Sequence, residues 1–409
     1  MEFLTVDSVE TARKKLFSHT KDWLIKKETV PLETALGRIL AEDITALGNI
    51  PSFRRSTVDG YAVLSADTAA AGEGIPVFLT VKDRVEMGQS ASFAISHGEC
   101  ADIPTGGMLP GGADAVVMTE YSEPFGADGV AVYSSAANGE NVVQIGEDAK
   151  AGELLIGRGK RLLPQDIGAL AAAGITSVPV FTLPSLTIIS TGDELVSAEK
   201  EPADGQVRDI NTYSLTALAQ KTGFSVIETH VLTDDENILE RTIQPAMKTS
   251  DIIAVSGGSS QGAKDMTRAV IDRVSSPGVF THGLAVKPGK PTILGYDSLS
   301  NTLLAGLPGH PVSAMIVFEL MLGWLLREIT GNPEARVIPA KISVNVASSP
   351  GKLTCLPVKL RWTGNGYSAE PVFGKSGLIT TLTSADGYFI VNRNTEGLQS
   401  GQTVEVHLF

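Results

Sequence analysis

The sequence predicts a multidomain chain in which an α/β domain with a parallel sheet is combined with β-rich parts. Its 409 residues exceed the ~250–300 at which one hydrophobic core usually stops growing. From residue 181 onward, apolar strands alternate with helices, whereas residues 49–141 and 332–409 consist of short β-like runs between turns. Hydrophobic residues make up 43% of the chain and charged residues 19%, as is usual for a folded protein. We therefore expect several packed domains of different class.

The N-terminal part mixes helix and strand. Residues 7–10 resemble a capping box, and the helix that they open places Val9, Ala12 and Leu16 on one face. Residues 168–173 form a second, small-residue helix before a short strand. This part is predicted as α+β.

The α/β domain is predicted from buried strands that alternate with amphipathic helices. Such a pattern indicates a parallel sheet that is covered by helices on both faces. The expected strands are residues 186–189, 225–229, 252–255 and 303–305. The expected helices are residues 213–221, 237–247, 267–274 and 311–329.

Charge and cysteine content limit the class of protein. A net charge of −13 and a pI of about 5.0 disfavour general binding to nucleic acid, although a few local lysines can still bind a small anion. Cys100 and Cys355 lie far apart without CxxC spacing, which fits a reducing cytoplasm. No signal-peptide pattern opens the chain, and the longest apolar helix candidate contains Glu319 and is too short to span a bilayer. We expect a cytoplasmic protein that binds neither nucleic acid nor membrane.

Three glycine-containing loops follow predicted strands of this domain. In an open parallel sheet, ligands bind beyond the carboxyl ends of the strands. Glu194 follows the first strand, and Gly257 and Gly258 follow another, with Asp265 shortly after. The third loop, residues 306–311, follows the strand at residues 303–305. The glycines allow the backbone to approach an anion closely, while the two acids supply oxygen ligands of the kind that Mg²⁺ prefers. The alternative for each loop alone is an ordinary turn or helix cap.

A proline-stiffened loop at residues 286–291 carries Lys287 and Lys290. Two ammonium groups on a short rigid segment suit an oxyanion or a phosphate. The loop does not match the P-loop pattern, because no GxxxxGK[ST] precedes a helix. The alternative is a pair of exposed turn lysines.

Two loops of the β-rich segment are further candidates. Asp59 follows Arg54 and Arg55, and could be an acidic metal or proton-transfer residue on a loop that reaches into a cleft. Thr105 lies in a glycine-rich loop that is also suited to close approach by a ligand. The alternatives are surface turns and a weak surface ion pair. Among the histidines, only His310 falls inside a candidate site loop.

Taken together, these segments resemble the molybdopterin molybdenumtransferase family, which includes bacterial MoeA and the E domain of gephyrin. The motifs occur in the expected order along nearly the whole chain, and their order makes the resemblance more specific than any one motif. The segments that carry it are residues 56–62, 105–106 with 112–117, 190–195, 287–291 and 306–313, together with 374–377 and 384–387 in the C-terminal part.

The resemblance implies a subunit of four parts that is usually a dimer, with a cleft that loops of the partner subunit help to form. The family's reaction uses adenylylated molybdopterin (molybdopterin-AMP) and molybdate as substrates and releases AMP with Mg²⁺ present. The implied parts are an elongated α+β domain (1–48 with 142–180), a β-rich inserted domain (49–141), an α/β molybdopterin-binding-like domain (181–331) and a small C-terminal β-barrel (332–409).

The resemblance also implies roles for individual residues, at the positions that match the family's motifs. Asp59, Glu194 and Asp265 are the expected acidic metal-site and catalytic residues, and Asp234 or Asp235 matches a further acidic position. The residues expected to bind the cofactor and the oxyanion are Thr105, Gly257, Gly258, Lys287, Lys290, Pro308 and Ser313.

Four positions depart from the family's pattern. Val58 stands where methionine is common, and His310 where asparagine is common. Ala263 replaces an acid, and Val143 replaces an arginine. Loss of one acid and one base could change metal affinity or the preference between molybdate and tungstate.

The leading hypothesis is an enzyme that inserts the metal into molybdopterin and releases AMP. A non-catalytic paralogue that carries or senses molybdopterin is the alternative, since Ala263 and Val143 could mark lost activity. The related adenylylating enzyme that acts one step earlier is less favoured, because it would not need the β-rich insertion or the barrel.

Overall fold

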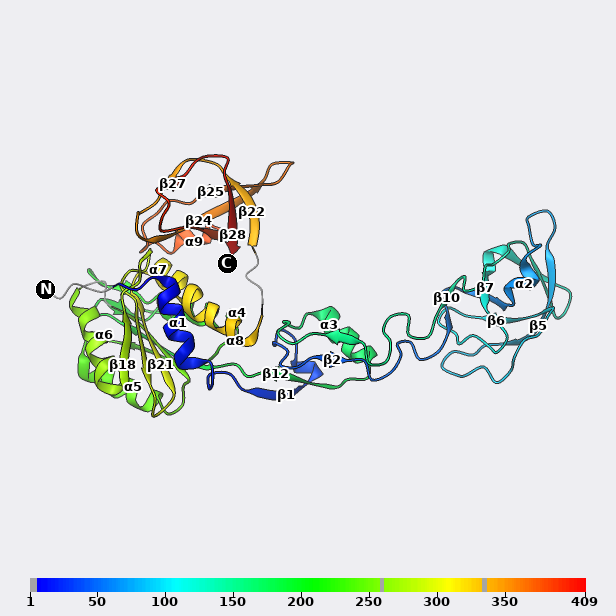
Figure 1. Cartoon of the computed structure of the whole chain (residues 1–409), viewed down its shortest axis with the longest axis horizontal. Helices are drawn as coiled ribbons and strands as arrows, with labels where there is room; N and C mark the ends of the chain where they lie inside the picture. The colour runs from blue at the N-terminus through cyan, green and yellow to red at the C-terminus, as the bar shows by residue number, and fades with distance from the viewer. Residues whose placement is uncertain (1–5, 258–260, 333–336) are drawn as a thin grey trace.

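The protein is elongated, with its parts arranged along one long axis (Figure 1). The computed structural model describes residues 6–257, 261–332 and 337–409, and for residues 261–265 it describes the backbone alone. The α/β sheet and the C-terminal strands lie together at one end of the molecule, and the β-rich segment lies at the other end. We keep the predicted limits of the four parts as a proposal.

A six-stranded sheet forms the centre of the α/β domain. Its order is β16 (Ser225–Leu232), β13 (Ser185–Thr191), β17 (Ile252–Gly257), β21 (Thr302–Pro308), β20 (Ile293–Asp297) and β18 (Pro277–His282). The first four strands are parallel, as predicted. The last two strands were not predicted: β20 forms a hairpin with β21 through the turn at residues 298–301 and runs antiparallel to both of its neighbours, β21 and β18.

Helices cover both faces of this sheet, as the sequence indicated. One face packs on α1 (Val9–Thr20), α4 (Asn211–Thr222), α7 (Pro311–Phe318) and α8 (Trp324–Thr330). The other face packs on α5 (Glu236–Ala246) and α6 (Gln261–Val274). No helix in the described part of the chain is long and apolar enough to cross a membrane.

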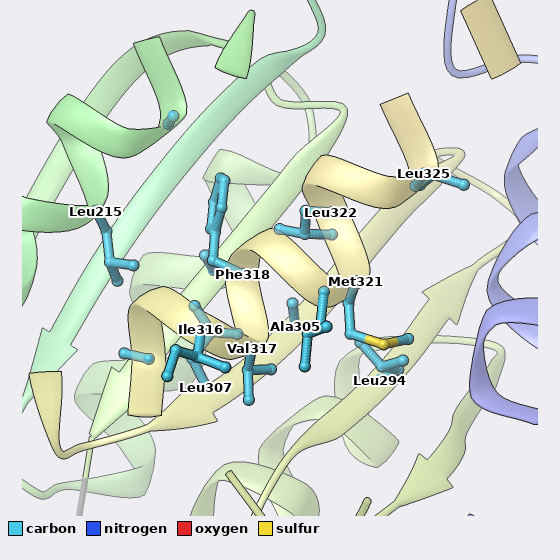
Figure 2. Packing of buried hydrophobic residues seen from close by; sticks show 14 of the residues in the cluster. Leu215, Leu294, Ala305, Leu307, Ile316, Val317, Phe318, Met321, Leu322 and Leu325 are labelled. Atoms are coloured by element: carbon cyan, nitrogen blue, oxygen red, sulfur yellow. The ribbon is translucent and has the colours of Figure 1, made fainter. Parts of the chain in front are cut away.

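The predicted single helix at residues 311–329 is interrupted. A π-helical segment, η3 (Glu319–Gly323), separates α7 from α8. Phe318, Leu322 and Leu325 of this continuous helical stretch are fully buried. Figure 2 shows Val317 and Met321 of the same stretch beside Ala305 and Leu294 of the sheet. Phe318 meets Phe224 edge to face, with ring centroids 5.6 Å apart. Apolar periodicity located the stretch correctly, but it did not show the π turn.

Five described strands close the predicted C-terminal barrel. They are β24 (Leu353–Trp362), β25 (Tyr367–Pro371), β22 (Val337–Ile342), β28 (Thr403–Leu408) and β26 (Gly387–Val391), and β26 pairs back onto β24. The α/β domain adds β19 (Val286–Lys287), which pairs with β24 in parallel. The backbone N–H of Leu353 also donates to the carbonyl of Ala285 at 2.8 Å. The barrel is therefore joined to the α/β domain through backbone pairing.

The β-rich segment forms a second six-stranded sheet, at the far end of the molecule (Figure 1). Its order is β7 (Ala115–Met118), β4 (Gly60–Val63), β6 (Glu99–Ile103), β5 (Val77–Arg84), β9 (Gly129–Val132) and β8 (Ser122–Phe125). Within the described chain, its α-helix is only the short α2 (Ser65–Thr68), as expected from the lack of an amphipathic stretch.

Two-stranded ladders build the part between the two ends. β1 (Lys27–Pro31) pairs with β12 (Ser177–Phe181), β2 (Ile44–Thr45) with β11 (Leu154–Ile156), and β3 (Arg55–Ser56) with β10 (Val142–Val143). The expected helix at residues 168–173 is α3 (Pro164–Ala172). The remaining short elements are η1 (Leu32–Thr34), η2 (Thr119–Tyr121), β14 (Leu195–Val196), β15 (Val207–Arg208), β23 (Val346–Ala347), α9 (Thr380–Thr383) and β27 (Gly397–Leu398).

The core beneath η3 yields a first prediction. Leu322→Ala should lower the free energy of unfolding by about 2–5 kcal/mol, because it leaves a cavity among side chains that cannot fully collapse. Leu299→Ala is the matched control, since Leu299 is 88% exposed, and it should change stability by less than about 0.5 kcal/mol. Denaturant unfolding measures both, and equal effects would contradict the described packing.

Candidate active site at the carboxyl edge of the sheet

Acidic side chains gather where β13 and β16 end. Asp193 and Glu194 follow β13 and are exposed, and half-buried Asp234 follows β16. The backbone N–H of Asp234 donates to Asp193 Oδ1 at 3.0 Å, which fixes the two loops against each other. We call Asp193, Glu194 and Asp234 the acid rim.

The acid rim is electrostatically strained. Burial raises the pKa of Asp234, and the negative charges of Asp193 and Glu194 raise it further, while the nearby Thr191 hydroxyl only partly offsets this. Thr191 Oγ1 and Asp234 Oδ1 are both buried without a hydrogen-bond partner of good geometry. A bound cation or a proton would relieve the repulsion among these carboxylates.

Asp234, and not Asp235, belongs to the acid rim. Asp235 is the N-cap of α5, where its side chain accepts hydrogen bonds from the backbone of Asn237 and Ile238. That role is structural. The sequence left the choice between these two acids open, and the cap geometry separates them.

Gly257 brings the ends of β13 and β17 together. A Cβ at this position would lie 1.8 Å from the Thr191 hydroxyl oxygen, so only glycine fits. Gly257 is also the Cα partner of Pro308 at the end of β21. The acid rim on one side and the loop after β21 on the other therefore meet at adjacent strand ends.

A cleft of about 580 Å³ opens on the β21 side, between the α/β domain and the barrel. Four lysines line it: Lys287 at the end of β19, Lys290 in the loop that follows, and Lys352 and Lys375 from the C-terminal part. The described residues that line it include no Asp or Glu. This lysine cleft is suited to a small, multiply charged anion, in spite of the chain's overall negative charge.

The lysine loop is held rigidly in place. Lys287 Nζ donates to Ser349 Oγ at 3.0 Å, and the Thr292 hydroxyl donates to the carbonyl of Gly289 at 2.7 Å. Gly289 has a φ of +117°, and a Cβ there would lie 2.4 Å from Val317 Cγ2. The position requires glycine for both its backbone conformation and its packing.

The loop after β21 forms another wall of the lysine cleft. Pro308 and buried Ser313 line it, and α7 begins there with Pro311 at its first position. His310 Nδ1 lies 2.8 Å from Ser376 Oγ of the C-terminal part. His310 therefore links the α/β domain to the barrel loop.

Asp59 and Thr105 form a separate pair in the β-rich lobe. The backbone N–H of Thr105 donates to Asp59 Oδ1 at 2.6 Å. Hydrogen bonds from Thr105 lower the pKa of Asp59, so this exposed carboxylate stays ionised. The lobe lies at the opposite end of the molecule from the α/β sheet (Figure 1). One chain thus does not bring Asp59 and Thr105 to Glu194.

The predicted site residues fall into three groups in space. Lys287, Lys290, Pro308 and Ser313 line one cleft, with Glu194 and Gly257 at the neighbouring strand ends, and Asp59 and Thr105 are remote. Gly258 and the side chain of Asp265 lie outside the described residues, although the backbone of Asp265 is in α6. Among the side chains that are described, no three His, Cys, Asp or Glu residues form a group that could hold a metal ion.

Several residues near the site were missed by sequence reasoning. Lys352 and Lys375 each follow a glycine in the C-terminal part, but only the β19–β24 pairing shows that they face the lysine loop. Buried Asp209 and Asn211, at the start of α4, lie among short irregular segments with no periodicity to mark them. The signal that could have found them is the presence of two polar residues, two positions apart, where a helix begins.

Family models match three consecutive stretches of the chain. They are described as "MoeA N-terminal region (domain I and II)" at residues 7–174, "Probable molybdopterin binding domain" at residues 187–328, and "MoeA C-terminal region (domain IV)" at residues 339–409.

Relatives and solved structures cover nearly the whole length. The molybdopterin molybdenumtransferase of Bacillus subtilis is 32% identical over 93% of this chain and 89% of its own. The enzyme of the same name from Haemophilus influenzae is 29% identical over 98% of each. A crystal structure of a molybdopterin biosynthesis MoeA protein from Pyrococcus horikoshii covers 99% of this chain and 100% of its own, at a TM-score of 0.83 and 30% identity.

The strained acid rim predicts a stabilising substitution. Asp234→Asn should raise the free energy of unfolding of the ligand-free protein at pH 7, by less than about 1 kcal/mol after solvent screening. Because the pKa of Asp234 is raised on folding, the ionised carboxylate opposes folding. The gain should therefore vanish as the pH falls through that pKa and the wild-type group protonates.

Asp235→Asn is the matched control, because it removes the same charge one residue away and asparagine is an equally good N-cap. Thermal unfolding across pH 3 to 8 measures both variants. An equal gain from the control would show that general charge, and not the acid rim, is responsible.

Proposed function

The chain belongs to the molybdopterin molybdenumtransferase (MoeA) family of molybdenum cofactor biosynthesis, and on that premise we propose that it inserts molybdate or tungstate into adenylylated molybdopterin with Mg²⁺-dependent release of AMP. The observation that carries the proposal is the lysine cleft that adjoins the acid rim at the carboxyl edge of one sheet. The lysine cleft offers cations, and the acid rim offers carboxylates. A reaction between an oxyanion and a phosphoanhydride requires both.

The lysine cleft supplies the anion-binding half of the site. Lys287 and Lys290 come from the α/β domain, whereas Lys352 and Lys375 come from the C-terminal part, so an anion between them is held from two sides. The positive end of the α7 dipole adds to the field at this wall of the cleft. Such preorganised charges favour phosphate or molybdate oxygens, and they stabilise charge that develops as the phosphoanhydride breaks.

The acid rim fits a Mg²⁺ ion that is held in part by the substrate. Mg²⁺ prefers oxygen ligands and is usually bound through one or two carboxylates together with phosphate oxygens. The unpartnered oxygens of Thr191 and Asp234, beside Asp193 and Glu194, are donors of that type. When bound, the ion would neutralise phosphate charge at the bond to be cleaved. We assign Glu194 and Asp265 to this half of the site, with Asp234 as a further member.

We propose that the protein is a homodimer in which each site is completed by the partner. Asp59 and Thr105 lie on a distant lobe, so they can reach Glu194 only from a second copy. An ionised Asp59 would then add a carboxylate opposite the acid rim. A reducing, cytoplasmic location is part of the proposal, because Cys100 and Cys355 are both unpaired and buried.

Release of AMP from molybdopterin-AMP tests the reaction directly. The wild-type protein should release AMP when Mg²⁺ and molybdate or tungstate are present, with the two oxyanions assayed in parallel. Glu194→Gln should lower the rate by ~100-fold or more, because it removes a charge from the acid rim. Glu199→Gln, an exposed acid on the same segment, should stay within about twofold of wild type. Binding of molybdopterin-AMP without any AMP release would favour the carrier alternative.

Mixing inactive variants tests the shared site. Asp59→Ala and Glu194→Gln should each be inactive alone, because each spoils both sites of its homodimer. Subunits that are unfolded and refolded together in equal amounts should recover about a quarter of wild-type activity, since half of the dimers then contain one intact site. Recovery should be absent when two preparations of the same variant are mixed. No recovery in a mixed dimer of confirmed composition would mean that Asp59 does not act across the interface.

A further inference from the structure

Asn211 bonds Gly309 in the wall of the lysine cleft and Ser256 at the end of β17, which leads toward the acid rim. It is the first residue of α4 and is only 9% exposed. Its Nδ2 donates to Ser256 Oγ at 2.7 Å and to the carbonyl of Gly309 at 2.8 Å. The Ser256 hydroxyl in turn donates to the carbonyl of Pro308 at 3.3 Å. One buried amide thereby ties β17 to the loop after β21.

The two contacts of Asn211 lead in opposite directions. Ser256 directly precedes Gly257, which packs under Thr191 at the acid rim. Gly309 directly precedes His310, which bonds to Ser376 at the lysine cleft. A short chain of hydrogen bonds and packed backbone therefore runs from the barrel loop, through Asn211, to the acid rim.

The neighbours of Asn211 reinforce this position. The next residue, Thr212, shares a hydrogen bond of 2.9 Å between its hydroxyl and that of Ser190, near the end of β13. The start of α4 is thus fastened to three strand ends at once, through Ser190, Ser256 and Gly309. None of these contacts involves a residue to which the proposed reaction gives a chemical role.

One polar atom of Asn211 is left without a partner. Its Oδ1 is buried and accepts no hydrogen bond in the described structure. An unsatisfied buried acceptor costs free energy, so the residue is not explained by stability alone. An amide is the group that can donate two hydrogen bonds from one nitrogen here, whereas aspartate offers no donor to the Gly309 carbonyl.

We propose that Asn211 is a positioning residue that sets the distance and orientation between the lysine cleft and the acid rim. This inference rests on the proposed function, because it concerns the alignment of the two halves of the proposed site. Each half is built from its own elements and keeps its own ligand affinity without Asn211. The reaction needs both halves at once, so misalignment lowers turnover while binding of the oxyanion is preserved.

The test compares variants that break the hydrogen bonds of Asn211 or Ser256 with a control variant that leaves these bonds intact. Asn211→Asp keeps the shape of the side chain, Asn211→Ala removes it, and Ser256→Ala breaks the chain of hydrogen bonds at its next member with a smaller change. Ser214→Ala is the matched control, because Ser214 lies on the same first turn and its hydroxyl bonds only the carbonyl of Asn211, at 3.4 Å.

Three quantities are measured on the full-length protein: kcat for AMP release, the Kd of molybdate alone by calorimetry, and hydrogen exchange in peptides from residues 252–257 and 305–310. The donor-removing variants should lower kcat by about tenfold or more and change the molybdate Kd by less than about threefold. Hydrogen exchange should rise in both peptides. Ser214→Ala should match wild type in all three measurements.

Loss of molybdate binding in proportion to kcat would overturn the inference, since Asn211 would then act as a binding residue. Unchanged exchange in either peptide would also overturn it, because the two loops would not be coupled through the amide. If the wild-type protein releases no AMP, the proposed function fails. Hydrogen exchange in the two peptides still decides whether Asn211 joins the end of β17 to the loop after β21. If both Asn211 variants fail to fold, Ser256→Ala decides the outcome by the same criteria.

Discussion

The pairing of β19 with β24 is the constraint on which the candidate site depends. Two residues of the α/β domain, Val286 and Lys287, enter the ladder of the barrel opposite Leu353 and Thr354. That ladder fixes the lysine loop against the C-terminal part, and the buried core continues across the junction through Cys355, Leu382 and Tyr388. A cleft with lysines on two walls results because backbone hydrogen bonds, rather than the lysines themselves, hold the two domains together. Mutually repelling cations could not form it alone.

Charge is distributed unevenly, and this distribution follows from the topology. The chain carries a net charge of −13, yet four of its lysines face one cleft and the acids gather at the adjacent strand ends. Parallel strands deliver their carboxyl ends to one edge, so residues that are distant in sequence meet there. The raised pKa of Asp234 and the unpartnered oxygens beside it show that the acid rim is not arranged for stability in the ligand-free state. We infer that this cost is tolerated because the acid rim binds a ligand.

The sequence predicted the regular parts of this structure better than the way they are joined. Apolar strands such as Ile252–Gly257 and the buried helix after Pro311 were found because their periodicity reflects burial on the sheet. The antiparallel strands β18 and β20 and the π turn at Glu319–Gly323 were not found, since they depend on a hairpin and on local packing.

For the candidate site, sequence motifs located the lysine loop and Glu194 in the chain. Lys352, Lys375 and Asn211 could not be placed, because their neighbours come from other domains and other strands. The distance of Asp59 from Glu194 likewise depends on the elongated arrangement of whole domains, which no local pattern records.

We propose that the lysine cleft and the adjacent acid rim are two halves of one oxyanion-transfer site. The most direct measurement is the position of tungstate in crystals soaked at low concentration, located by the anomalous scattering of tungsten. We expect one principal tungstate peak in the cleft, within hydrogen-bond distance of Lys287 or Lys290 and of Lys352 or Lys375. A principal peak elsewhere on the protein, with the lysine cleft empty at the same tungstate concentration, would contradict it.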